Sequence, residues 1–195
     1  FPDGRIGVPL GTWRGWDGEL PCGQQTIVII SEDGGQSWPT FSRVFDGRKS
    51  GFIHWEQCLI ARENDLLAVA WEYDPVRQEN QPSVFATSTE SPPKFSSPKP
   101  TGFLAETCEL VAIGTSKVLS VYRGTDQPGL WGTLSEVKNG AWTNQYSAPI
   151  WQGPLSRMDG KTNHADGLAN LKFGSPSIKV LHEGEIFVTF WCQEE

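Results

Sequence analysis

The chain has 195 residues and a formal net charge of −7, and 37% of its residues are hydrophobic, which is enough for one sizeable core. The acidic balance argues against a nucleic-acid-binding protein, because such proteins present basic patches to phosphates. No apolar stretch approaches the roughly 18 residues of a membrane span, so we expect no membrane contact. The many glycines, prolines and tryptophans favour an all-β protein with short strands.

The chain begins with Phe1, and its only methionine is Met158. We therefore expect either a removed leader or a piece of a longer protein. A basic segment followed by an apolar one, which is typical of a signal peptide, is missing from the sequence. The compartment of the protein stays open on these grounds.

The cysteines lack the close spacing of a zinc site, and no other pattern predicts a metal or cofactor. They are Cys22, Cys58, Cys108 and Cys192. Cys58 and Cys108 fall inside apolar segments that resemble strands, where a free cysteine usually acts as a small buried hydrophobe. We expect the thiols to be reduced.

The first clear element joins the β-branched run 26–30 to the octet S-E-D-G-G-Q-S-W at Ser31–Trp38. This pattern predicts a strand, a tight turn and a second strand. We expect Ser31 and Asp33 to bind backbone amides across the turn, and Gly35 to supply a positive φ. Trp38 is expected to fold back onto the apolar side of the hairpin.

Two weaker copies of the octet follow. Ser88–Phe95 keeps the serine, an acid and the aromatic residue, and Ser135–Trp142 keeps the serine, a turn former and the tryptophan. The octets begin at positions 31, 88 and 135, which are 57 and 47 residues apart. This period suits a four-stranded propeller blade.

Apolar hairpins with polar turns repeat in phase with the octets. They span Leu59–Val69, Val111–Val121 and Ile178–Val188, and Pro2-Asp3-Gly4 reads as a fourth such turn. An aromatic residue with a polar or sulfur-containing neighbour follows each hairpin. These pairs are Trp13-Arg14, Trp71-Glu72, Tyr122-Arg123 and Trp191-Cys192.

The two landmarks divide the chain into four repeat units within a single partial domain. The approximate units are 1–48, 49–100, 101–152 and 153–195. The first unit lacks its opening strand, and the last stops after its second strand. A closed propeller usually has four to eight blades, so about three and a half blades do not close a ring.

The octet Ser31–Trp38 matches the Asp box, S/T-x-D-x-G-x-T/S-W/F, and the chain resembles the sialidase-like Asp-box (BNR repeat) family. Segments such as His54-Trp55-Glu56-Gln57 also resemble an uncharacterised bacterial group with this fold. The resemblance implies an all-β propeller of four-stranded antiparallel blades. The chain is then a fragment, or it completes its ring as a homo-oligomer, because unpaired blade edges promote aggregation.

Successive turns of a blade alternate between the two faces of the ring, so the Asp boxes share one face with the first hairpin turns. The resemblance implies that the opposite face carries the active site. The candidates for substrate binding there are Trp13, Arg14, Asp17, His54, Trp71, Tyr122, Arg123 and Asp126. The candidates for catalysis are Glu56, Tyr73 and Asp74. Aromatic residues mixed with acids and arginines favour a carbohydrate ligand.

Each candidate has a structural alternative. Trp71 and Tyr122 would also serve as packing between blades. Arg14 and Arg123 suit a clamp on a carboxylate, but they equally suit ion pairs with the nearby acids Asp17 and Asp126. Glu56 opens an apolar strand, where a charge is costly without a partner or a function.

Sialidases hold the substrate carboxylate with three arginines, and they use a tyrosine nucleophile, a glutamate that activates it, and an aspartate acid/base. The resemblance places Glu56 at the activating glutamate and Arg123 at one of the arginines. It places Trp71-Glu72 where another arginine is expected, and Phe173 where the tyrosine is expected.

Three hypotheses therefore stand. The first is a sialidase-like glycoside hydrolase, or part of one, that acts on a terminal acidic sugar, with Glu56 as general base or activator of a nucleophile. The second is a non-catalytic glycan-binding or scaffold propeller, which the missing tyrosine favours. The third is a polysaccharide lyase on the same architecture, which would release an unsaturated product that absorbs in the ultraviolet.

Overall fold

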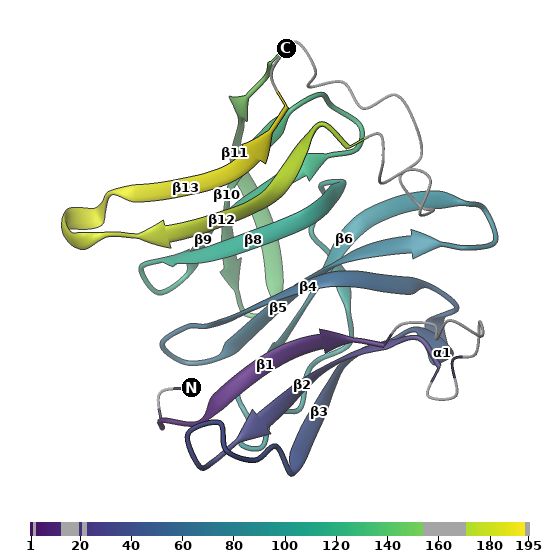
Figure 1. Ribbon diagram of the computed structural model, residues 1–195, viewed down its shortest axis with the longest axis vertical. Coiled ribbons are helices and arrows are strands. Elements are labelled where there is room, and N and C mark those ends of the chain that lie inside the picture. Colours follow the sequence, from purple (N-terminus) through teal and green to yellow (C-terminus); the bar gives the residue numbers. More distant parts are fainter. Residues whose placement is uncertain (2, 13–19, 21–22, 154–170, 194–195) are drawn as a thin grey trace. The chain divides into compact units, whose positions relative to one another are not determined.

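The computed structural model describes residues 1, 3–12, 20, 23–153 and 171–193. Nearly all of the regular structure in these residues is β-strand, as Figure 1 shows, so the predicted all-β class is confirmed. The chain divides into two compact units, Phe1–Thr101 and Gly102–Glu195, called the first and second unit below. Every sheet pairing within them is antiparallel between strands that follow one another along the chain.

The first unit begins with a three-stranded sheet in the order β1-β2-β3. Its strands are β1 (Ile6–Gly11), β2 (Gln25–Ser31) and β3 (Thr40–Asp46). Alternate residues of the central strand β2, such as Val28 and Ile30, are almost fully buried, as expected for a strand that packs one face on a core. The short helix α1 (Gly47–Ser50) then ends at Gly51, whose φ of 80° is favourable only for glycine.

The second sheet of the first unit has the order β4-β5-β6-β7. Its strands are β4 (Ile53–Ala61), β5 (Leu66–Asp74), β6 (Glu79–Ser88) and β7 (Lys99–Pro100). The turn expected at Asn64-Asp65 joins β4 to β5. The core between the two sheets consists of Val28, Ile30, Val44, Phe45, Ala68, Ala70, Val84 and Ala86.

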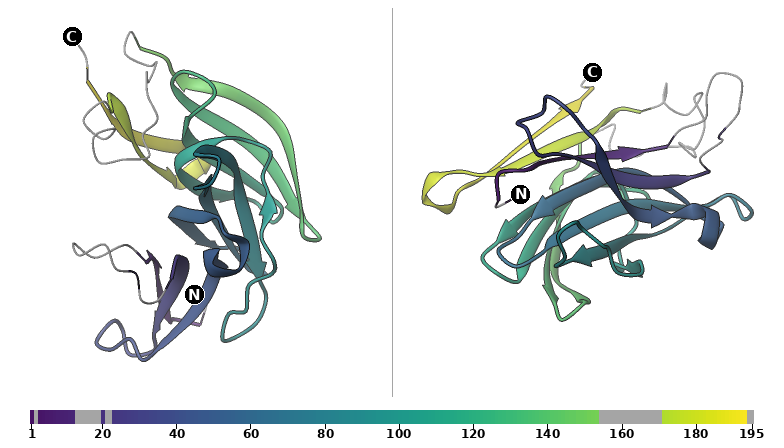
Figure 2. Two further views of the ribbon diagram at one scale, coloured as in Figure 1. Left: turned by 90° about the vertical axis from the view of Figure 1, so that its right-hand side faces the viewer. Right: turned by 90° about the horizontal axis from the view of Figure 1, so that it is seen from below.

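The second unit contains a four-stranded sheet in the order β11-β10-β9-β8 and a two-stranded sheet of β12 and β13. The first comprises β8 (Ala105–Ile113), β9 (Lys117–Gly124), β10 (Leu130–Lys138) and β11 (Ala141–Trp151). The second comprises β12 (Phe173–Val180) and β13 (Ile186–Cys192), joined by a 3₁₀ turn, η1 (His182–Gly184). Figure 2 shows the long β10–β11 ribbon curving along its length.

The hairpin turns of the second unit also fall where the sequence predicted them. The β8–β9 hairpin turns between Ile113 and Lys117, and the β12–β13 hairpin turns around Glu183 and Gly184. Phe173 is fully buried with Val121 and Leu130, and this cluster joins β12 to the neighbouring four-stranded sheet.

The opening strands of three sheets share a β-bulge at an equivalent place. Two residues of β4 lie between the paired positions Trp55 and Cys58, where β5 has only one, and the same irregularity recurs in β8 and β12. The bulged residues Glu56, Thr107 and Ser175 have φ values of 48°, 50° and 46°. Left-handed backbone is uncommon outside glycine, and bulges of this kind re-aim side chains.

The Asp-box turn is built as the sequence predicted. Ser31 Oγ accepts a hydrogen bond from the Gly35 amide at 2.8 Å, and Asp33 Oδ1 accepts one from the Ser37 amide at 2.9 Å. Gly35 has a φ of 93°, and its Cα faces the ring of Trp38. In the second octet, Ser88 Oγ accepts a bond from the Lys94 amide at 2.8 Å, in the same role.

Cys58 and Cys108 are buried, as predicted, and Cys192 is partly buried. Within the described ranges, no helix is long and apolar enough to span a bilayer.

Candidate functional site

The predicted site residues divide between the two units. The first unit contains His54, Glu56, Trp71, Tyr73 and Asp74 on β4 and β5, and the second contains Tyr122, Arg123 and Asp126 on and after β9. Trp13, Arg14 and Asp17 lie outside the described residues.

His54 and Glu72 form an ion-pair geometry across β4 and β5. His54 Nε2 lies 3.0 Å from Glu72 Oε2, and the side chains are 1% and 14% exposed. A carboxylate oxygen accepts, so this bond places a hydrogen on Nε2. The ring of His54 stacks on Phe45 with 5.2 Å between centroids, and its Nδ1 is buried with no hydrogen-bond partner among the described residues.

The polar pair and the neighbouring aromatic residues face opposite sides of the sheet, because side chains alternate along a strand. Glu72 continues the row of Ala68 and Ala70, which belongs to the core shared with β2 and β3. Trp71 and Tyr73 face the other side, where Trp55 lies 4.7 Å and 5.4 Å from their ring centroids. Trp71 and Tyr73 are buried, so in this structure they pack together and do not present open faces for sugar stacking.

Three further polar residues, Thr12, Gln24 and Glu56, are linked to His54 through backbone hydrogen bonds or lie near it in the sequence. Gln24 Nε2 donates to the carbonyl of Thr12 at 3.1 Å and to the carbonyl of His54 at 3.4 Å. Glu56 follows His54 by two residues and is exposed on its bulge. We call this group, formed by Thr12, Gln24, His54, Glu56 and Glu72, the polar end of the first unit.

Three described arginines near the polar end in the sequence, Arg43, Arg48 and Arg77, pair with acids. Arg48 binds Asp46 through Nε and Nη2 at 2.7 Å and 2.8 Å, and Arg43 Nε lies 3.8 Å from the same carboxylate. The Arg48 guanidinium holds the pKa of Asp46 down at about 2. Arg77 Nε lies 3.8 Å from Asp74.

Asp74, a predicted catalytic residue, stabilises a turn. Its Oδ1 accepts hydrogen bonds from the amides of Val76 at 2.8 Å and Arg77 at 3.0 Å. This is the ordinary role of aspartate at the start of a turn, and here it shapes the connection from β5 to β6.

Arg123 in the second unit pairs with Glu106, and both side chains are buried. Arg123 Nη2 donates to Glu106 Oε2 at 2.8 Å, and Nη1 donates to the carbonyl of Phe173 on β12 at 3.3 Å. The sequence offered Asp126 as the partner of this arginine, but the partner is Glu106. A side chain added at Gly174 would meet Nη1, so the glycine makes room for the guanidinium.

Tyr122 is buried and lies in a chain of hydroxyl groups. Its Oη lies 2.9 Å from Thr133 Oγ1, which lies 2.8 Å from Ser147 Oγ, and its ring stacks on Phe103 at 4.6 Å. Burial raises the pKa of the Tyr122 phenol to about 12. The Tyr122 phenol therefore stays neutral near pH 7. Asp126 lies in the exposed loop that follows β9.

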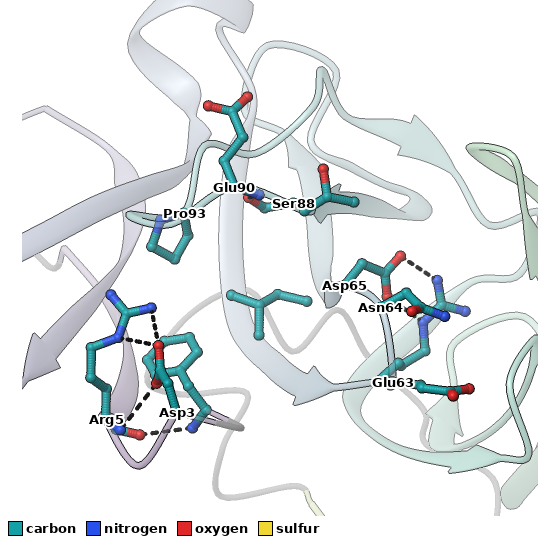
Figure 3. A pocket seen from close by; sticks show the side chains of 12 residues that line it. Asp3, Arg5, Glu63, Asn64, Asp65, Ser88, Glu90 and Pro93 are labelled. Carbon is teal, nitrogen blue, oxygen red and sulfur yellow. Dashed lines mark hydrogen bonds and ion pairs between the residues drawn. The ribbon is translucent and has the colours of Figure 1, made fainter.

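A shallow pocket lies at the other end of the β4–β5 hairpin, about 20 Å along the strand at ~3.3 Å per residue. Its cavity volume is about 190 Å³, and its lining includes the hairpin turn at Glu63–Asp65 and the second box loop at Ser88–Pro93. Figure 3 shows Arg5 turned toward Asp3 within it. The hairpin turn and the box loop thus share one end of the sheet, as predicted, and the polar end lies at the other.

Both arginines of this pocket pair with acids, and Glu63 and Glu90 line it as well. Arg5 Nη2 lies 2.7 Å from Asp3 Oδ2 and donates to Ser91 Oγ at 2.8 Å, and Arg62 Nη2 lies 2.6 Å from Asp65 Oδ2. These pairs balance the charge of both arginines, so the pocket lining offers an anionic ligand no unpaired arginine. In the described part of the chain, no three histidine, cysteine or acidic side chains are grouped as metal ligands.

Sequence reasoning missed two residues with a central place in this geometry. Glu72 and Glu106 were placed on the face opposite the Asp boxes, but neither was chosen as a catalytic or substrate-binding residue, and their partners His54 and Arg123 were not foreseen. A charged residue on an otherwise apolar strand is the signal for both, because such a group needs a partner or a function.

Comparison with known proteins supports the fold alone. No family model matches the chain, and no curated protein matches it. A solved structure of a protein of unknown function from Dyadobacter fermentans is similar, with a TM-score of 0.65 and 15% sequence identity. The similarity covers 97% of this chain and 46% of that one, so the chain spans about half the length of its structural neighbour.

Proposed function

We propose that this chain belongs to a sialidase-like Asp-box propeller and binds carbohydrate at the polar end of its first unit without cleaving it by sialidase chemistry. Glu72 carries the proposal. The Glu72 side chain is 14% exposed, and its carboxylate is fixed by a buried histidine at 3.0 Å. A fixed carboxylate accepts hydrogen bonds from sugar hydroxyls without a further loss of side-chain entropy.

Three features of the second unit support binding over hydrolysis. Arg123 is buried against Glu106, so its guanidinium already holds a carboxylate. Tyr122 has a pKa raised to about 12, which does not suit a phenolate nucleophile. Phe173, at the position that the resemblance gives to the nucleophile, is fully buried in an apolar cluster. A sialidase-like hydrolase is the competing hypothesis.

The test is a calorimetric titration of the chain with a panel of neutral, amino and acidic sugars, followed by chromatography of each mixture after prolonged incubation. We expect binding in the millimolar range or tighter, with every sugar recovered intact. Glu63→Gln, at the opposite end of the β4–β5 hairpin, is the matched control and should bind as the wild type does. Absence of binding to every sugar would contradict the proposal. Release of a monosaccharide that stops in Glu56→Gln would instead establish a hydrolase.

A further inference from the structure

The buried Nδ1 of His54 indicates that this histidine is retained for a reason other than stability. The side chain is 1% exposed and packs on Phe45, yet Nδ1 has no hydrogen-bond partner among the described residues. An unsatisfied buried polar atom costs free energy, and such atoms are rare in native proteins. A phenylalanine would fill this space without that cost. What the histidine adds is the Nε2–H group that faces Glu72.

The bulge in β4 creates this pairing. Between the β4–β5 turn and Cys58, each residue of β4 pairs with one residue of β5. If this register continued along β4, Glu72 would lie opposite Trp55. The extra residue in β4 shifts the register by one, so Glu72 faces His54 instead. The bulge is maintained although Glu56 has a φ of 48°, which is unfavourable for a residue with a side chain.

The ion pairs of the described arginines on β3, on α1 and after β5 indicate which ligand groups the Glu72 carboxylate can attract. Arg43 and Arg48 share Asp46, and Arg77 lies beside Asp74, so these guanidiniums already have acidic partners. Glu72 has His54 as its hydrogen-bond partner among the described residues, and part of its side chain reaches solvent. A partly exposed carboxylate attracts O–H and N–H donors and repels another carboxylate.

We propose that Glu72 contacts the ligand directly, that His54 is its positioning residue, and that the site takes sugars whose edge donates hydrogen bonds. Neutral sugars and amino sugars fit this chemistry, and sugars with a carboxylate do not. This inference rests on the proposed carbohydrate binding, and it reverses the acidic-sugar preference that the family resemblance implies.

The experiment compares His54→Phe, His54→Gln and Glu72→Gln with the wild type by calorimetry. The probes are methyl glucoside, glucosamine and N-acetylneuraminic acid. We expect His54→Phe and Glu72→Gln to weaken binding of the first two probes by about tenfold, the loss of one charge-assisted hydrogen bond. His54→Gln should bind within about threefold of the wild type, because the glutamine amide places an N–H group where Nε2 lies.

Thermal unfolding of the same variants separates positioning from a structural role. His54→Phe should melt close to the wild-type temperature, because it removes the orphaned Nδ1 and keeps the packing on Phe45, while the partly exposed Glu72 side chain can bind water in place of Nε2. Loss of affinity without loss of stability supports the inference. Equal losses in His54→Gln and His54→Phe would overturn it, as would full affinity in Glu72→Gln.

The failure of this inference is distinguishable from failure of the proposed function. If the wild type binds N-acetylneuraminic acid more tightly than the other probes, or if Glu72→Gln binds all of them normally, the inference is wrong and carbohydrate binding stands. If the wild type binds neither these probes nor any sugar of the panel that tests the proposed function, both are overturned.

Discussion

At the scale of single residues, Asp33 fixes the Asp-box turn through its carboxylate. Bonds from the Ser37 hydroxyl at 2.6 Å and the Ser37 amide at 2.9 Å, helped by Ser31, lower its pKa from 3.8 to about 2. A carboxyl group whose pKa is lowered by folding stabilises the folded state above its unfolded pKa. That contribution is lost as the pH falls from about 4 to about 2.

Asp33→Asn should therefore reduce the pH dependence of stability in this range. The asparagine side chain does not titrate, so the variant lacks this part of the loss on acidification. The measurement is urea unfolding of wild type and variant at several pH values between 5 and 2. Asp126→Asn, in an exposed loop, is the control and should follow the wild type. A variant curve parallel to that of the wild type would show that the turn does not depend on the charge.

The Asp-box turn was predictable because its contacts are local. Ser31, Asp33 and Gly35 act within five residues of one another, so their spacing alone implies the turn. The partner of Arg123 was not predictable in this way. Glu106 lies 17 residues away, and only the register of β8 against β9 brings the two side chains together.

At the scale of elements, the β-bulges explain why both buried pairs escaped the sequence. In the regular register set by the β8–β9 turn, Arg123 would face Thr107, and the bulge moves Glu106 to that place. In the same way, the bulge in β4 places His54 opposite Glu72, where the regular register would place Trp55. The hairpins were readable from apolar alternation and polar turns, but a one-residue insertion in a strand leaves no such signal.

Arg123 also joins elements, since it binds Glu106 on β8 and the Phe173 carbonyl on β12. Arg123→Met should lower the free energy of unfolding by about 3–5 kcal/mol, because it leaves Glu106 buried without its partner. Urea unfolding measures this loss. The double variant Glu106→Leu/Arg123→Met should recover most of it, since no unpaired charge then remains.

Arg77→Met is the control for this prediction. Its ion pair with Asp74 is exposed, with 74% of the arginine side chain accessible, so the change should cost less than about 1 kcal/mol. If Arg123→Met were as stable as the wild type but lost affinity for acidic sugars, the arginine would be a substrate clamp and the structural role would be wrong.

At the scale of the whole molecule, repeated sequence landmarks were enough to predict an all-β chain of consecutive antiparallel sheets. The β4–β7 and β8–β11 sheets have four strands each, whereas β1–β3 has three and β12–β13 has two. The structural neighbour is about twice as long as the region that it shares with this chain. The sequence does not reveal what covers the edges of the shorter sheets, because edge pairing depends on chain segments that the landmarks do not describe.

The edge strands differ in how they resist pairing with other chains. Proline interrupts β1 at Pro9, β7 at Pro100 and β11 at Pro149, and a proline on an edge strand prevents further pairing. Strand β13 has the sequence I-F-V-T-F-W-C, with neither proline nor charge. Ile186, Phe187 and Trp191 on this strand are exposed. Strand β13 therefore presents an apolar edge, and it has no proline or charged residue of its own to prevent pairing with another strand.

We therefore expect the 195-residue chain to self-associate through β13, because an apolar edge strand without charge or proline readily pairs with another strand. Light scattering over a range of concentrations should give a mass above that of one chain, 21.6 kDa. Thr189→Lys introduces a charge on the strand and should shift the mass toward the monomer, whereas Thr143→Lys, on β11, should not. A monomer at all concentrations would mean that the exposed side chains of β13 do not suffice for pairing, and a mass unchanged in Thr189→Lys would place the contact elsewhere.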